Sequence, residues 1–145
     1  MGKSKVMVAI GNEASVESLV VLACQLCKGM DADLTALHVV AVPLLTPLDA
    51  PNEAIDHQGR ELLAQAQRVA EKCSQPLSTE LLRAREVGEA IVGVARDEHV
   101  DLLVMGHHKP HPHSLGDTFL GGTIRYAAHR APCRVIVQIP APEHK

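Results

Sequence analysis

Aromatic side chains are almost absent from this 145-residue chain, which contains one phenylalanine, one tyrosine and no tryptophan. Proteins that hold single-stranded nucleic acids stack the bases on aromatic rings, and cages of such rings hold quaternary ammonium ligands. This composition excludes both kinds of site. The core must instead be aliphatic, built from valine, leucine, isoleucine and alanine.

Long apolar runs and an excess of positive charge are also missing. The longest runs, residues 19–24 and 39–45, are far shorter than the roughly 20 residues that cross a bilayer. The formal net charge of −3 argues against a nucleic-acid groove and against a polybasic membrane anchor. The first residues lead into an apolar strand pattern without a signal-peptide core. We therefore expect a cytoplasmic protein that binds neither nucleic acid nor membrane.

The four cysteines include one CxxC pair, Cys24 and Cys27. A redox CxxC belongs at the amino end of a helix, where the helix dipole lowers the pKa of the thiol. This pair falls late in a helical pattern, and the sequence has no second pair to complete a zinc site. Two small buried side chains one turn apart are the favoured interpretation.

Apolar runs typical of strands alternate with segments of helical periodicity along the whole chain. Strands are predicted at residues 5–10, 34–40, 79–84, 101–105 and 133–138, with helices starting near residues 16, 55, 88 and 118. This alternation predicts one α/β domain over residues 1–145, a parallel sheet with helices on both faces. Ligands of such sheets bind beyond the carboxyl ends of the strands.

Five segments, in this order and spacing, resemble the universal stress protein family over nearly the whole chain. They are residues 5–10, 32–40, 87–91, 100–106 and 131–137. The resemblance implies a three-layer, Rossmann-like fold whose five-stranded parallel sheet has the order 3-2-1-4-5. It also implies a homodimer made by pairing the last strand, Arg134–Gln138, with its twin.

Family members that hold ATP carry a glycine, two residues, a second glycine, nine residues and then Gly-Ser or Gly-Thr. In this chain Gly106 matches the first glycine, but Lys109 stands at the second. The late pair falls on Gly121 and Gly122, after eleven residues rather than nine, and Thr123 supplies one hydroxyl. The phosphate loop is therefore degenerate, although its glycines still offer main-chain amides to an anion.

The strand ends and the degenerate loop together give the predicted nucleotide site. The acidic residue that often ends the family's first strand is missing, because Gly11 and Asn12 stand there. The residues predicted to contact the ligand are Ile10, Gly11, Asn12, Val39, Val40, Met105, Gly106, His107, Lys109, Gly121, Gly122 and Thr123.

Histidine is unusually frequent, with nine copies, of which four lie in residues 107–113. The prolines of this loop favour an extended path, which brings at most two imidazoles to one side, whereas a metal site needs three or four ligands. A solvated loop, a weak metal site and a pH-dependent positive charge beside a phosphate are the three interpretations. His38, in a buried strand, is predicted to be a hydrogen-bonded core residue.

The sequence thus predicts a small regulatory domain without strong catalytic chemistry, capable at most of weak ATP hydrolysis. Its expected ligand is an adenine nucleotide, ATP, AMP or a cyclic nucleotide, with no metal required and Mg²⁺ entering only with ATP. One alternative is a nucleotide-free, dimeric protein-interaction module. A second is metal or pH sensing by residues 107–113.

Overall fold

Five parallel strands form a single sheet with the order β3-β2-β1-β4-β5 in the computed structural model, which describes residues 3–107 and 122–139. The strands are β1 (Ser4–Ala9), β2 (Ala32–Ala41), β3 (Leu77–Ala84), β4 (Leu102–Gly106) and β5 (Arg134–Gln138). The predicted α/β fold and strand order are confirmed. In its register, Val8 of β1 lies between Ala36 of β2 and Val104 of β4.

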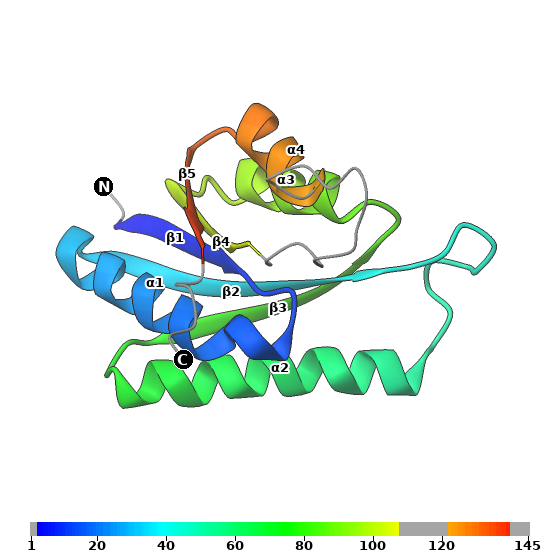
Figure 1. The fold of residues 1–145 in the computed structure, drawn as a ribbon, viewed down its shortest axis with the longest axis horizontal. Helices are drawn as coiled ribbons and strands as arrows, with labels where there is room; N and C mark the ends of the chain where they lie inside the picture. Colours follow the sequence, from blue (N-terminus) through cyan, green and yellow to red (C-terminus); the bar gives the residue numbers. More distant parts are fainter. Residues whose placement is uncertain (1–2, 108–121, 140–145) are drawn as a thin grey trace, which may run out of the picture.

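Helices cover both faces of the sheet (Figure 1). The α-helices of the described segments are α1 (Val16–Met30), α2 (Glu53–Lys72), α3 (Val87–Asp97) and α4 (Gly122–Arg130). Helices α1 and α2 bury one set of alternate strand residues, including Val8 and Ala36. Helices α3 and α4 bury the other set, including Met7 and Leu37. The two aliphatic cores are the consequence of strands that alternate their side chains between two covered faces.

Short polar side chains set the starts of two helices. The Asn12 side-chain oxygen accepts a hydrogen bond from the Ser15 amide at 3.3 Å and caps the short 3-10 helix Glu13–Ser15 that precedes α1. The Asn52 side chain accepts from the Ile55 amide at 3.2 Å and caps α2. Satisfying these amides is the ordinary role of an N-cap. The predicted start of the last helix, near residue 118, lies outside the described residues.

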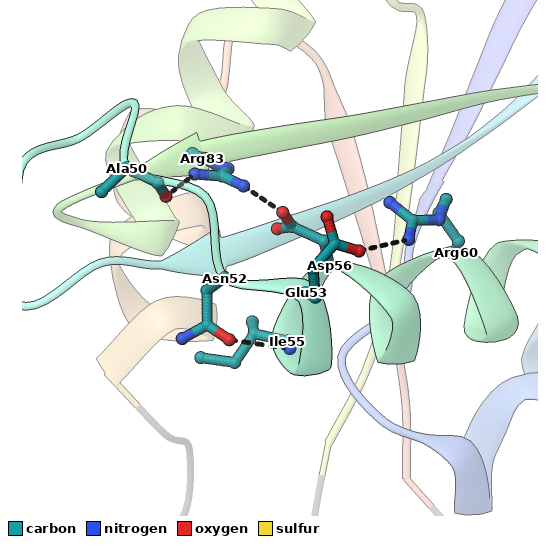
Figure 2. A network of polar contacts seen from close by, with 7 residues as sticks. All are labelled: Ala50, Asn52, Glu53, Ile55, Asp56, Arg60 and Arg83. Carbon is teal, nitrogen blue, oxygen red and sulfur yellow. Dashed lines mark hydrogen bonds and ion pairs between the residues drawn. The ribbon is translucent and has the colours of Figure 1, made fainter.

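Two arginines at the end of β3 fasten the connection between β2 and α2. Arg83 donates hydrogen bonds to the Asp56 carboxylate on α2 and to the Ala50 carbonyl oxygen (Figure 2). Arg85 donates to the carbonyl oxygens of Pro43 and Thr46. The second carboxylate oxygen of Asp56, Oδ1, is buried and has no hydrogen-bond partner among the described residues. Among the described residues, Arg83 is the basic side chain that compensates the charge of Asp56.

Glu80 of β3 and Glu98, which follows α3, bring two carboxyl groups together, in contrast to the oppositely charged pair Arg83 and Asp56. A hydrogen bond from one carboxyl to the other, assisted by partial burial, raises the pKa of Glu80 to about 7. The hydrogen bond is the main reason that this proton is retained, and the burial of Glu80 and the negative charge of Glu98 act in the same direction.

We expect the substitution Arg83→Leu to lower the free energy of unfolding by about 2–3 kcal/mol, because it leaves the Asp56 carboxylate buried and uncompensated. Urea unfolding measures the loss. Arg60→Leu is the matched control, since Arg60 is exposed and forms a 3.8 Å ion pair with Glu53, which is more exposed still; it should cost under about 0.5 kcal/mol. A loss for Arg83→Leu no larger than for the control would contradict this account.

The Glu80 carboxyl should make stability depend on pH. Because its pKa is higher in the folded protein, its contribution is complete below its ordinary pKa and is lost as pH rises through about 7. The substitution Glu80→Gln removes this loss, so the variant should gain roughly 1 kcal/mol on the wild type between pH 5 and pH 8, discounted for solvent exposure. Urea unfolding at both pH values measures the difference in stability. Stability profiles of the variant and the wild type that run parallel with pH would contradict this role of Glu80.

Candidate functional site

A cavity of about 280 Å³ opens at the carboxyl ends of β1 and β4. The chain leaves β1 toward the face covered by α1, and it reaches α4, on the opposite face, after β4. Adjacent connections that diverge in this way leave a crevice between them, the usual ligand position in parallel sheets. The lining comprises Ala9, Ile10, Gly11, Ser15, Leu19, Leu37, Val39, Val87, Ile91, Met105, Gly106, His107, Gly122, Thr123 and Ile124.

The cavity brings together eight of the residues that the sequence predicted for the site. These are Ile10, Gly11, Val39, Met105, Gly106, His107, Gly122 and Thr123. Two further residues, Lys109 and Gly121, lie outside the described residues. The remaining two, Asn12 and Val40, are not part of the lining.

Local geometry explains why Asn12 and Val40 fall outside the cavity. The Asn12 side chain is used to cap the helical turn that follows it. Val40 follows Val39 in β2, and successive strand residues point to opposite faces, so Val39 reaches the cavity while Val40 faces α2. A strand end presents two faces, and only one of them borders the cavity.

Seven lining residues were absent from the prediction. They are Ala9, Ser15, Leu19, Leu37, Val87, Ile91 and Ile124. The period of two could have found Leu37, which precedes Val39 by two positions on the same face. The period of a helix links Val87 to Ile91, one turn apart on α3. Nothing in the sequence shows, however, that α3 closes the cavity.

The described part of the lining is apolar and carries no aspartate, glutamate, lysine or arginine. Its polar side chains are the hydroxyls of Ser15 and Thr123 and the imidazole of His107. Gly122 and Thr123 form the first turn of α4, where main-chain amides are not used by the helix itself. A Cβ placed on Gly122 would meet no atom of the described residues within 4 Å.

His107 is held at the cavity wall by the end of the sheet. Its main-chain amide donates to the Gln138 carbonyl oxygen at 2.9 Å, which extends the pairing of β4 with β5 by one residue. The residue is 8% exposed, so at least this histidine of the loop is not a solvated one. Residues 108–113, on which the metal and pH interpretations mainly depend, lie outside the described residues.

His38 is hydrogen-bonded, as predicted, but it is half-buried rather than part of the buried core. Its Nδ1 lies 2.7 Å from the Ile10 carbonyl oxygen, which can only accept, so this ring nitrogen carries the proton. The ring also packs against α2, because a Cβ on Gly59 would lie 3.0 Å from the His38 Cδ2. Gly59 therefore allows α2 to approach β2 closely.

Cys24 and Cys27 are buried in α1 and unpaired, as the structural interpretation predicted. Burial raises the pKa of the Cys24 thiol to about 12 and that of Cys27 to about 11. Such thiols are poor nucleophiles and poor metal ligands at neutral pH. Within residues 3–107 and 122–139 no cluster of three or more histidine, cysteine, aspartate or glutamate side chains could hold a metal ion. No helix in the same ranges is long and apolar enough to span a membrane.

Comparison with known proteins agrees with the fold. The model of the universal stress protein family matches residues 3–138. A universal stress protein of Methanothermobacter thermautotrophicus is 30% identical over 128 residues, covering 83% of this chain and 85% of that protein.

Two solved structures share the fold and contain nucleotides. The universal stress protein of Archaeoglobus fulgidus in complex with dAMP has a TM-score of 0.75 and 17% identity, with 94% of this chain and 98% of that one covered. A universal stress protein family protein of Arabidopsis thaliana with AMP bound has a TM-score of 0.69 and 16% identity, covering 95% and 92%. The match over residues 3–138 and the curated relative show that the chain belongs to the universal stress protein family.

Proposed function

We propose that the chain is a regulatory nucleotide-binding protein that holds an adenine nucleotide, preferentially a monophosphate, in the cavity beyond β1 and β4. The observation that carries this proposal is a largely apolar cavity whose lining includes the first turn of α4. The relatives with dAMP and with AMP support the same ligand class.

The base would lie in the apolar part of the cavity, between Ile10, Val39 and Met105. Leu37 and Ile91 are buried beside them, and both line the same space. The chain has too few aromatic residues to stack on a purine, so the base would be held by dispersion contacts and by excluding water from its two faces. Affinity then depends on close fit, which a small cavity provides.

The phosphate would lie at the start of α4. The main-chain amides of the first turn of α4, the Thr123 hydroxyl and the positive end of the helix dipole all favour an anion there. The described lining holds no lysine or arginine to balance several negative charges. We therefore expect AMP or a cyclic monophosphate to bind more tightly than ATP. Lys109 and Gly121 remain predicted contacts, and Mg²⁺ would enter only with ATP.

Binding rather than catalysis is the proposed activity. A hydrolase acting on ATP commonly needs a carboxylate to hold a metal or to orient water. The part of the lining that the structure describes supplies hydroxyls and one imidazole but no carboxylate. We expect hydrolysis of ATP to be weak at most.

The second candidate function is a dimeric protein-interaction module that uses no nucleotide. It is favoured by the residues after β1, where Gly11 and Asn12 replace an acidic residue and Asn12 is engaged in a helix cap. Both candidates share the proposed homodimer through β5. This strand is an edge of the sheet. Because the Gln138 carbonyl faces β4, the main-chain groups of Val135 and Val137 face outward, toward a partner.

Filling the cavity should separate the two candidates. Ala9 lines the cavity, so Ala9→Leu adds three carbon atoms to it and should weaken AMP binding at least tenfold. The matched control is Ala41→Leu, since Ala41 points to the same face of the sheet but is exposed and outside the lining. Calorimetric titration of metal-free protein with AMP, cyclic AMP and ATP gives the affinities. Absence of binding by the wild type at millimolar nucleotide would favour the interaction module.

The dimer proposal predicts that Val137→Pro loses the association made through β5. Proline removes an amide that faces away from β4, so an edge strand should tolerate it while losing a bond to the partner strand. Sedimentation velocity measures the change in mass, and circular dichroism confirms that the variant is folded. A folded variant that sediments like the wild type would overturn the β5 dimer.

A further inference from the structure

Exposed apolar side chains are concentrated in β3 and in the segments that connect β2 to α2. Eight large hydrophobic residues in the described ranges are exposed, and six belong to β3, the β2–α2 connection or the first turn of α2. They are Leu44, Leu45, Leu48, Ile55, Leu81 and Leu82. Leu45 is 100% exposed, and the connection that carries it projects beyond the end of the sheet (Figure 1). Monomeric proteins seldom leave a large contiguous apolar surface uncovered.

The strand beneath this surface has an unpaired edge. Strand β3 is terminal in the sheet, and none of the described strands pairs with its outer side. The Ala84 carbonyl accepts from the Val42 amide, so the main-chain groups of Ala84 point inward, toward β2. Alternate residues of an extended strand point the other way, so the amides and carbonyls of Thr79, Leu81 and Arg83 face outward.

The surface is held in one arrangement before anything binds. Leu48, Leu81 and Leu82 line one shallow pocket of about 670 Å³, together with Asp49, Asp56, Arg60 and Arg83. Arg83 joins the Ala50 carbonyl to Asp56, which fixes the segment that carries Leu48 next to β3 (Figure 2). Little ordering would therefore be required on binding, and this favours association.

We infer that this surface pairs with a second copy of the chain, with the two β3 edges antiparallel about a two-fold axis at Leu81. In an antiparallel pair, opposite residues of one kind exchange both main-chain hydrogen bonds, and they need outward-facing amides and carbonyls. Leu81 meets this condition opposite its own copy, and Thr79 meets it opposite the Arg83 of the second copy. The same register places the exposed leucines of the two copies together.

The charges of the pocket favour a second copy over a strongly charged partner. The pocket contains two acidic residues, Asp49 and Asp56, and two basic ones, Arg60 and Arg83. A two-fold interface brings one surface patch against the same patch of the other copy. A patch with one sign of charge would therefore repel itself. A balanced surface does not, and it offers no excess charge to an acidic or basic partner.

This interface is separate from the β5 dimer and from nucleotide binding. Both interfaces would extend the same sheet, one at each edge, so copies could add at both sides. The expected behaviour of the wild type is therefore association beyond a dimer as concentration rises. The cavity contains no residue of β3 or α2, so its affinity for AMP should not change when β3 is altered.

The double substitution Leu81→Lys and Leu82→Lys tests the inference, because it places lysines at the proposed two-fold axis. The two leucines are 36% and 37% exposed, so lysine ammonium groups can reach solvent in an isolated chain but would repel across the axis. Met30→Lys is the matched control, because Met30 is 40% exposed at the end of α1. Leu48→Lys changes the pocket without touching the sheet, and it covers the case in which the double variant does not fold.

Sedimentation equilibrium over a hundredfold range of concentration measures association for each variant and for Val137→Pro. We expect the lysine variants of the β3 surface to stop at the dimer, with the remaining association at least tenfold weaker, and Met30→Lys to behave as wild type. The Val137→Pro variant should keep only the β3 pairing. Two results would overturn the β3 inference. One is association of the β3 variants equal to that of the wild type. The other is a wild type that forms only a dimer, which Val137→Pro abolishes; neither result would contradict the nucleotide and β5 proposals.

Discussion

The burial of β1 between β2 and β4, with helices on both faces, is the constraint on which the other features depend. Val6, Met7 and Val8 are almost fully buried, so neither face of the strand can accept a polar residue. Its neighbours connect to helices on opposite faces, and this divergence creates the cavity at its carboxyl end. The scarcity of aromatic residues follows the same logic, since two thin, tightly interdigitated layers are filled well by Val, Ala, Leu and Ile.

The fold could be predicted from the sequence because its signals are local and repeated. The apolar runs of β1 and β4 and the periodicity of α1 and α3 appear within short windows, and the order of segments then limits the topology. Strand ends were less accurate, since β3 begins at Leu77 rather than residue 79. Leu77 pairs with Leu34 of β2, and a pairing across 43 residues leaves no mark within a short window of sequence.

The site was predictable only where strand ends determine it. Ile10, Val39, Met105 and Gly106 follow directly from the rule that ligands lie beyond carboxyl ends. Val40 is not part of the cavity lining, because its side chain points to the opposite face of β2 from Val39. Ile91 could not be predicted, because α3 reaches the cavity by tertiary packing. The Arg83–Asp56 contact was equally invisible, since it joins residues 27 positions apart on different elements.

The β2–α2 connection follows a strand that lines the candidate cavity and leads to the proposed β3 surface, but the contacts that anchor it do not involve cavity residues. Strand β2 carries Val39 in the cavity wall, and immediately afterwards the chain turns into the segment that Arg83 and Arg85 fasten to the β3 edge. These anchors hold carbonyl oxygens and a buried carboxylate rather than cavity residues. Strand β2 pairs with β1 over residues 32–37 and with β3 over residues 34–41, so it is held within the sheet, and a disturbance at the β3 edge would have to shift β2 to reach the cavity. Cores packed at crystalline density resist such shifts. A family fold of this size can therefore carry a ligand site and an assembly surface that change independently.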